Sequence, residues 1–428
     1  MNSLTKESRV TQLIDHLFRH ETGKMVAVLT RIFGPENMGL AEDVVQDSLV
    51  EAISHWTYQG VPDNPSAWLF RVAKNKALNI VNREKYKRQY SSDVVHHLKS
   101  EWTAEPALDY FFSEQEILDD QLRMIFTCCH PAISADSQVA LALKTLCGFS
   151  IPEIAKAFLT TEENINKRLV RARQKIREDK IPFEVPQGKE LEKRSEAVLE
   201  TIYLLFNEGY SASKGNDLIR YELCEEAIRL AEIIEKHPAI PNKSIIYGLL
   251  ALMQLNASRF SSRQDKEGNL LTMAEQNRSQ WNRSLIAKGL SNLEKASFGN
   301  PVSIYNILAA ISACHCLAPD FESTDWKSIL SLYDNLIQAD HSPVVLLNRA
   351  IAVSKVYGTE KAMEELEKIS KIPAFKSYYL FYATKAEFYI TLNQFEKAIP
   401  VLETAIGLAP LQAEKQLLQK KLESCRKK

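Results

Sequence analysis

Apolar residues recur at steps of three and four along almost the whole chain, which is the spacing of helices that bury one face. No stretch shows the convincing period-2 alternation that is typical of a half-buried strand. The pattern therefore predicts an all-α protein. Turn and loop signals divide it at Gly34-Pro35, at GVPDNP (60–65) and at IPFEVPQG (181–188).

The first predicted unit covers residues 1–90 and contains an amphipathic helix over residues 40–56. Val44, Leu49, Ile53 and Trp56 are expected to pack inward. A loop follows, and a long helix is then expected from Ser66, its predicted N-cap, to about residue 90. The remaining face of the 40–56 helix is polar and carries Glu42, Asp43, Gln46 and Asp47.

The loop and the long helix after it, PDNPSAWLFRVAKNKALNIVNREKYKR, combine aromatic residues with amides and cations. Single-stranded nucleic acid is held by such stacking surfaces beside a positive track. The alternative is that Trp68, Leu69 and Phe70 belong to an ordinary core.

Residues 150–177 predict two short helices joined at a turn, with Thr160 or Thr161 as the cap of the second. The second helix has an apolar stripe at Ile165, Leu169 and Ala172, and most of its cations lie off that stripe. This is the arrangement of a helix-turn-helix that reads duplex DNA. A surface hairpin with a solvated charged face is the alternative.

The region from 190 to 428 repeats itself. TEKAMEELEKIS at 359–370 superimposes on FEKAIPVLETAI at 395–406, and WKSILSLYDNLI at 326–337 is a weaker copy. The shifts of 36 and 33 residues are close to the period of tetratricopeptide (TPR) repeats. A right-handed stack of TPR-like helix pairs is therefore expected, with unrelated helical hairpins as the alternative.

The formal net charge of −1 conceals strong local segregation. Residues 71–88 carry seven cations against one acid, whereas residues 93–120 carry eight acids against Lys99 alone. Local basic surfaces, and not the total charge, then decide which partners bind. Residues 91–116 are predicted to be an acidic linker before a second unit at 117–180. This linker is expected either to mimic nucleic acid or to act as a solvated tether.

The sequence gives little support to an enzyme, a metal protein or a membrane protein. The seven cysteines show no disulfide framework, and the clusters 128–130 and 314–316 lack the spacing of zinc ligands. No phosphate-binding loop, dinucleotide motif or nucleophile elbow is present. The scattered cysteines suit a reducing cytoplasm, and no apolar run is long enough for a bilayer, so we expect a cytoplasmic protein. No cofactor is expected.

Three motifs in order resemble the extracytoplasmic-function (ECF) group of bacterial RNA polymerase sigma factors. AEDVVQDSL is similar to region 2.2, PSAWLFRVAKNKALNIVNREK to regions 2.3 and 2.4, and IPEIAKAFLTTEENINKRLVRARQKI to region 4.2. DDQLRMIFTCCHP, LLFNEGYSAS and QDKEGNLLTMAEQNRSQWNRSLIAKG resemble a subgroup with a long TPR-like C-terminal extension. The resemblance implies binding to the clamp helices and flap of core RNA polymerase and to promoter DNA.

The resemblance also assigns roles to residues. Glu42, Asp43, Gln46 and Asp47 would bind the polymerase. The −10 element would be bound by Asp63, Asn64, Ser66, Trp68, Arg71, Lys74, Asn75, Lys76, Arg83, Lys85, Lys87 and Arg88. The −35 element would be bound by Thr161, Glu162, Asn164, Lys167, Arg168, Arg171 and Arg173.

Thr161-Glu162-Glu163 departs from the small neutral residues with which many relatives open this helix, so the −35 sequence cannot be copied from them. The C-terminal repeats are expected to modulate activity, and a protein or peptide is their expected partner. Two other hypotheses are a stand-alone helix-turn-helix regulator with a TPR-like sensory domain and a repeat scaffold with no DNA role. The first leaves the 40–88 motifs unexplained, and the second leaves the basic helix unexplained.

Overall fold

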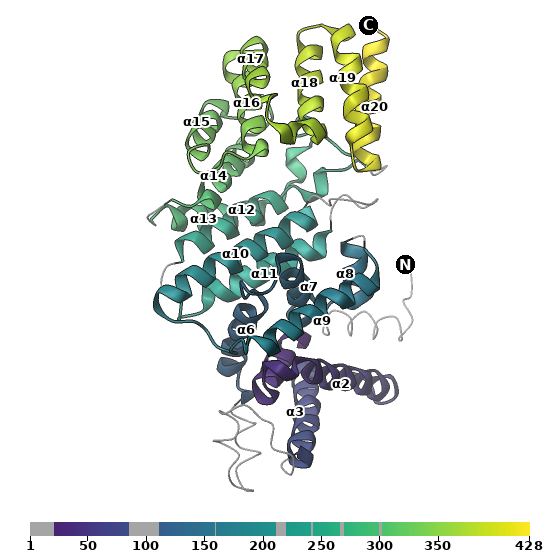
Figure 1. The fold of residues 1–428 in the computed structure, drawn as a ribbon, viewed down its shortest axis with the longest axis vertical. Helices are drawn as coiled ribbons and strands as arrows, with labels where there is room; N and C mark the ends of the chain where they lie inside the picture. The colour runs from purple at the N-terminus through teal and green to yellow at the C-terminus, as the bar shows by residue number, and fades with distance from the viewer. Residues whose placement is uncertain are drawn as a thin grey trace. The chain divides into compact units, whose positions relative to one another are not determined.

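The computed structural model describes residues 21–84, 111–158, 160–210, 220–240, 243–265, 269–298 and 302–428. Within these ranges the ordered elements are helices, and the β structure is limited to one isolated bridge between Gln264 and Leu270 (Figure 1). The all-α fold class is confirmed. Lys85, Lys87, Arg88 and most of the predicted acidic linker lie outside the described residues.

The chain divides into two compact units. Unit 1 reaches to Leu204 and includes Lys236–Ala239, and unit 2 comprises Leu205–Glu235 and Ile240–Lys428. The division falls within helix α10. None of the helices in the described ranges combines the length and the apolar character that crossing a bilayer requires.

Unit 1 begins with two small helical bundles. The N-terminal bundle consists of the helix at residues 21–33, η1 (Pro35–Asn37), α2 (Met38–Gln59) and α3 (Pro65–Glu84). The helix-turn-helix bundle consists of α6 (Glu114–Cys128), α7 (Ala135–Thr145), α8 (Ile151–Ala157) and α9 (Glu162–Glu178). Helix α10 (Gly188–Tyr210) follows.

The N-terminal bundle has a core in which Phe33, Trp56 and Leu69 are fully buried. Val44 and Trp56 pack inward as expected, but the prediction for Ile53 is wrong, because its side chain is 45% exposed. The buried stripe of α2 passes instead through the small residue Ala52, one position away.

The ends of these helices are set by local hydrogen bonds. Gly60 ends α2 with a φ of 88°, a conformation that glycine adopts without strain, and donates to the carbonyl of Trp56. The N-cap predicted at Ser66 is wrong. Helix α3 begins at Pro65, and the Asn64 side-chain oxygen accepts from the Ala67 N–H at 2.9 Å.

The predicted turn between α8 and α9 is confirmed. Ser150 and Glu153 form a capping box at the start of α8. The Thr161 hydroxyl caps α9 by accepting from the Asn164 N–H. The apolar stripe of α9 is buried as expected, at Ile165, Leu169, Ala172 and Ile176.

Unit 2 contains the remaining helices of the described ranges. They are α11 (Tyr221–Lys236), α12 (Ser244–Ala257), η2 (Phe260–Ser262), η3 (Arg278–Gln280), α13 (Arg283–Ser297), α14 (Ile304–Leu317), α15 (Trp326–Leu336), α16 (Pro343–Tyr357), α17 (Thr359–Ile369), η4 (Pro373–Ser377), α18 (Tyr379–Thr391), α19 (Phe395–Leu408) and α20 (Gln412–Arg426). Lys236 itself belongs to unit 1.

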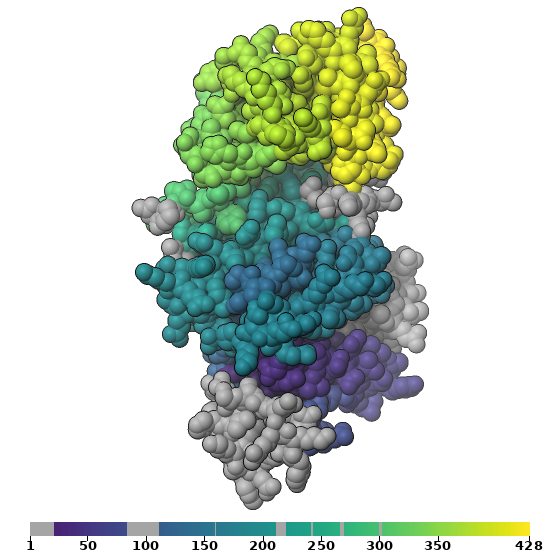
Figure 2. Space-filling view, viewed as in Figure 1, coloured from purple at the N-terminus to yellow at the C-terminus, as the bar shows by residue number. Residues whose placement is uncertain are grey.

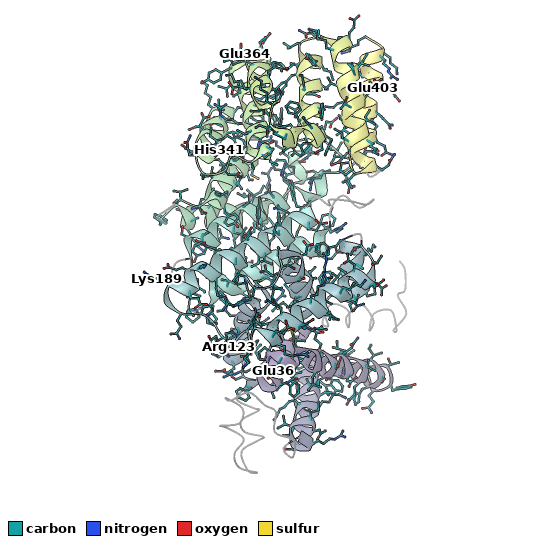
Figure 3. The ribbon with its side chains drawn as sticks, viewed as in Figure 1. Glu36, Arg123, Lys189, His341, Glu364 and Glu403 are labelled. Atoms are coloured by element: carbon teal, nitrogen blue, oxygen red, sulfur yellow. The ribbon has the colours of Figure 1, made fainter. Side chains whose placement is uncertain are left out.

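The predicted repeats correspond to helix pairs in which α16 packs on α17 and α18 packs on α19. The residues that superimpose in sequence are equally buried: Ala362 and Ala398 are fully buried, and Leu366 and Leu402 are each 1% exposed. Figure 2 shows that atoms fill the space between the helical ribbons of these pairs. Glu364 of α17 and Glu403 of α19 have exposed side chains (Figure 3).

Two arginines of unit 2 contact the C-terminal ends of helices: Arg263, just before the motif at 264–289, and Arg278, within it. The Arg263 guanidinium lies 4.1 Å from the Tyr210 ring and donates to the Tyr210 carbonyl. Arg278 stacks on Trp281 and donates at 2.6 Å to the carbonyl of His315, in the last turn of α14. Both arginines satisfy carbonyl groups at helix C-termini, which is a structural role.

Candidate nucleic-acid and polymerase interface

Helix α2 presents most of its predicted polar face to solvent. Asp43, Gln46 and Asp47 are exposed, while Ala41, Val44, Val45 and Ser48 are buried on the opposite side. Glu42 differs from the expectation that it points outward, because its side chain is only 12% exposed. Three of the four candidate residues therefore form one accessible polar surface.

Glu42 is buried against the helix-turn-helix bundle. Its carboxylate accepts from the Arg173 guanidinium at 2.5 Å. Burial raises the pKa of Glu42, although Arg173 and Lys144 oppose the shift. This ion pair joins a candidate polymerase residue to a candidate DNA residue.

The loop at 60–65 and the start of α3 combine exposed polar groups with packed aromatic rings. Asp63 and Asn64 are exposed, and Ser66 is half-buried. Trp68 is also half-buried, because its ring lies 5.4 Å from that of Trp56 and 5.2 Å from that of His55. Trp68 therefore packs against α2, and only part of its ring is accessible for stacking on a base.

Helix α3 carries an exposed polar stripe. Arg71, Asn75 and Arg83 are exposed, whereas Lys74 and Lys76 are half-buried. Lys76 pairs with Glu51 at 2.8 Å. The sequence reasoning missed Asn79, which is exposed and continues the i, i+4 spacing of the stripe.

Helix α9 distributes its candidate residues over several environments. Thr161, Glu162, Asn164, Lys167 and Arg171 are exposed. The Asn164 amide donates to the Thr160 hydroxyl at 2.8 Å, and Lys167 pairs with Glu163 at 2.7 Å on the helix surface.

Two arginines of α9 are occupied by acids from other elements. Arg168 pairs with Asp136 of α7 at 3.1 Å, and Arg173 pairs with Glu42. Sequence reasoning missed Val170, which is 59% exposed between Lys167 and Arg171. Val170 is a large apolar residue that lies off the buried stripe of α9, and this position could have identified it from the sequence.

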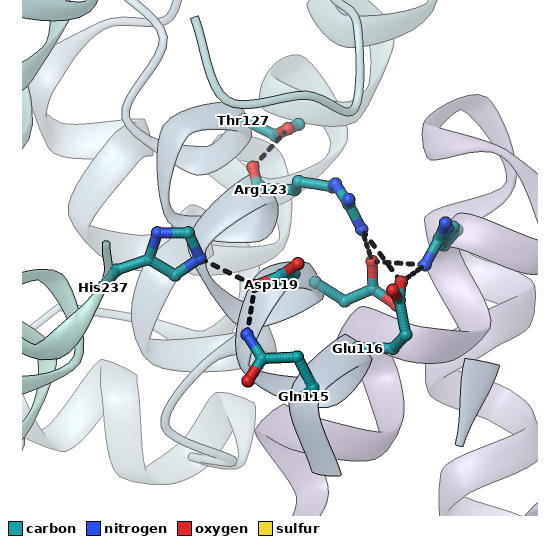
Figure 4. Close-up of polar contacts among 8 residues, drawn as sticks. Gln115, Glu116, Asp119, Arg123, Thr127 and His237 are labelled. Atoms are coloured by element: carbon teal, nitrogen blue, oxygen red, sulfur yellow. Dashed lines mark hydrogen bonds and ion pairs between the residues drawn. The ribbon is translucent and has the colours of Figure 1, made fainter. Parts of the chain in front are cut away.

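A network of ion pairs joins the helix at residues 21–33 to α6 (Figure 4). Arg31 pairs with Glu116 and lies 3.6 Å from Asp120, which also pairs with Arg123. Burial raises the pKa of Asp120 to about 7 despite both arginines. On the other side of α6, His237 contacts Asp119 at 2.8 Å.

The cysteine clusters do not form a metal centre in the part of the chain that the structure describes, where no group of three or more His, Cys, Asp or Glu is placed to hold an ion. Cys128 and Cys129 are buried, and burial raises the pKa of both thiols.

Comparison with known families assigns both bundles. The model for sigma-70 region 2 matches residues 17–86, and the model for sigma-70 region 4 matches residues 123–176. The chain belongs to the sigma-70 family. It is an RNA polymerase sigma factor of ECF-type architecture, a specificity subunit and not an enzyme, and it directs promoter recognition by binding core polymerase and promoter DNA.

The N-terminal bundle of this sigma factor is its region 2, and the helix-turn-helix bundle is its region 4. A family of unknown function, DUF6596, matches residues 194–297 of the C-terminal extension. An uncharacterized protein of Rhizobium meliloti (strain 1021) is 34% identical over 399 residues, which cover 93% of this chain and 92% of that protein. No solved structure matches the sigma factor.

Proposed function

We propose that the polar surface of α2 binds the clamp helices of core RNA polymerase. The support is the exposure of Asp43, Gln46 and Asp47 on one side of a helix whose other side is buried. Acids on a rigid helix suit a basic partner, because complementary charge speeds encounter and fixes register. Glu42 extends this surface at its edge toward region 4.

We propose that α3 and the preceding loop hold the melted −10 element. The loop with Asp63, Asn64 and Ser66 would receive a flipped base, whose unstacking costs a few kcal/mol that hydrogen bonds must recover. The Asn64 side-chain oxygen already caps α3, so its amide nitrogen is the group that turns to the base. Arg71 and Asn75 would follow the strand, and Arg83 the duplex upstream.

We propose that α9 reads the −35 element mainly through Glu162, Lys167 and Arg171, which are exposed. Arg suits guanine, and a carboxylate accepts from the cytosine amine. Val170 would contact a thymine methyl group. Thr161 and Asn164 set the start of the helix, which points backbone N–H groups toward phosphate.

We propose further that region 4 contacts the polymerase flap and that the C-terminal helical pairs modulate activity by binding a protein or peptide. Stacked helix pairs such as α16–α17 and α18–α19 are typical of surfaces that receive peptides. Because its partners are core polymerase and the chromosome, the sigma factor would act in the cytoplasm.

The observation that carries this proposal is the exposed acidic surface of α2, and Asp47→Arg tests it. We expect this variant to bind core polymerase at least about tenfold more weakly, since like charges then face each other. Binding of the labelled full-length chain to core polymerase is measured by fluorescence anisotropy, without DNA.

The control is Glu192→Arg, which makes the same charge change at an exposed position of α10. Melting curves establish that both variants are folded. Equal affinity of Asp47→Arg and Glu192→Arg for core polymerase would exclude α2 as the docking surface.

A further inference from the structure

The polymerase-binding helix of region 2 lies in contact with region 4 of the same chain. Arg173 of α9 and Glu42 of α2 are 131 residues apart in sequence and form an ion pair at 2.5 Å. Helix α9 also packs against η1, the element that precedes α2. Region 4 therefore touches region 2 at the edge of the surface proposed for the polymerase.

A cleft of about 270 Å³ runs along this contact. Region 2 lines it with Glu42 and Gln46, and region 4 lines it with Lys144, Ser150 and Glu153. Gln46 belongs to the exposed polar surface of α2, so a partner that binds along this surface meets the α7–α8 segment of region 4. Lys144 and Arg173 of region 4 already place positive charge beside Glu42, at the edge of the surface proposed for a basic partner.

The backbones of region 2 and region 4 also approach each other closely, at Gly23 and Leu146. A Cβ atom on Gly23 would lie 2.1 Å from the carbonyl oxygen of Leu146, the residue that caps α7. That distance is far inside van der Waals contact, and a backbone carbonyl cannot swing aside as a side chain can. Only glycine allows the helix at residues 21–33 to sit this close to region 4.

Some buried polar atoms at the contact between regions 2 and 4 have no hydrogen-bond partner among the described residues. Glu42 Oε1 and Arg173 Nε are buried and make no hydrogen bond to the residues that the structure describes. A buried ion pair with unpaired polar atoms contributes little net stability, because its attraction must offset the loss of hydration of both ions. Such an interface holds two bundles together and still yields to a competing partner.

We propose that region 4 of the free chain docks on the polymerase-binding side of region 2, so that core polymerase must displace it in order to bind. The proposal rests on the assignment of α2 as the polymerase surface. Lys167 and Arg171 stay exposed in this closed arrangement. It therefore restrains the binding of polymerase and leaves the DNA-reading side of α9 accessible.

The test compares two substitutions that weaken the contact without changing α2. Gly23→Ala inserts the Cβ atom that meets Leu146, and Arg173→Ala removes the ion pair. If the open form is a minor population, shifting the equilibrium toward it raises the apparent affinity for core polymerase, by about threefold to tenfold. Affinity is measured with the full-length chain and core polymerase, without DNA.

Each substitution has a matched control. Gly39→Ala makes the same change on α2, where a Cβ atom meets nothing within 4 Å, and Arg177→Ala removes an exposed cation of α9. Because alanine favours helix over glycine, Gly23→Ala is not expected to unfold region 2. We expect both controls to bind core polymerase as the unchanged chain does.

The proposal is overturned if neither Gly23→Ala nor Arg173→Ala binds core polymerase more tightly than its control. Asp47→Arg, measured in the same assay, separates this result from a wrong assignment of α2. Loss of binding by Asp47→Arg with no gain by the other two refutes the docking alone. Unchanged binding by Asp47→Arg refutes the polymerase surface itself.

Discussion

Arg168, Arg171 and Arg173 lie within two turns of α9, yet each side chain has a different environment. Arg168 is held by Asp136, Arg171 is exposed, and Arg173 is held by Glu42 of region 2. A cation that is already paired must give up its partner before it can bind DNA. Arg171 is therefore better placed than the other two to read a base.

We expect Arg171→Ala to reduce discrimination at one base pair of the −35 element by about 1–3 kcal/mol. The reason is the loss of a bidentate contact to a base edge, which the exposed guanidinium can make. The measurement is transcription from a panel of promoters that differ singly in the −35 element.

Lys175→Ala is the control, since Lys175 is paired with Asp179 at 2.9 Å near the end of α9. An equal loss on every promoter after Arg171→Ala would make Arg171 a phosphate contact, which carries no sequence information.

The wrong prediction for Glu42 has a cause that lies outside its own helix. The helical period of α2 places Glu42 on its solvated side, and the residues near Glu42 in the sequence give no sign of a buried partner. Its partner Arg173 comes from another bundle. A helical period shows which side of a helix is polar, but it does not show which polar residue finds a distant partner.

At the scale of elements, the helix-turn-helix and the repeats were predictable because their signals are local. Thr161 caps α9 through a hydrogen bond only three residues away. The repeats place equivalent alanines, Ala362 and Ala398, where neighbouring helices approach closely. The start of α3 was less predictable, because Asn64 and Ser66 are both good N-cap residues and lie two positions apart.

Ala398→Leu tests whether the helices of the repeats pack closely at the position of Ala398. We expect the larger side chain to destabilise unit 2 by about 1–3 kcal/mol, because Ala398 is fully buried between helices. Chemical denaturation of the full-length chain measures the change.

Glu403→Leu adds a leucine to the same helix, where the glutamate side chain is 51% exposed, and is expected to have little effect on unfolding. Equal midpoints for the two variants would contradict the packing of α19.

At the scale of the whole molecule, the ordered motifs for regions 2 and 4 were enough to indicate a sigma factor, and the family matches bear this out. Each motif is a continuous segment whose chemistry can be read directly. The contact between the two regions was not foreseen, since it depends on Gly23, Glu42 and Arg173, which only the folded chain brings to one interface.

The most direct test of promoter recognition is transcription in vitro from a library of random upstream sequences, with the full-length chain and bacterial core polymerase. The account predicts start sites that share −35 and −10 motifs and that are absent with core polymerase alone. If addition of the folded chain produces no start sites beyond those of core polymerase, and the chain does not bind core polymerase, that result would contradict the sigma factor assignment.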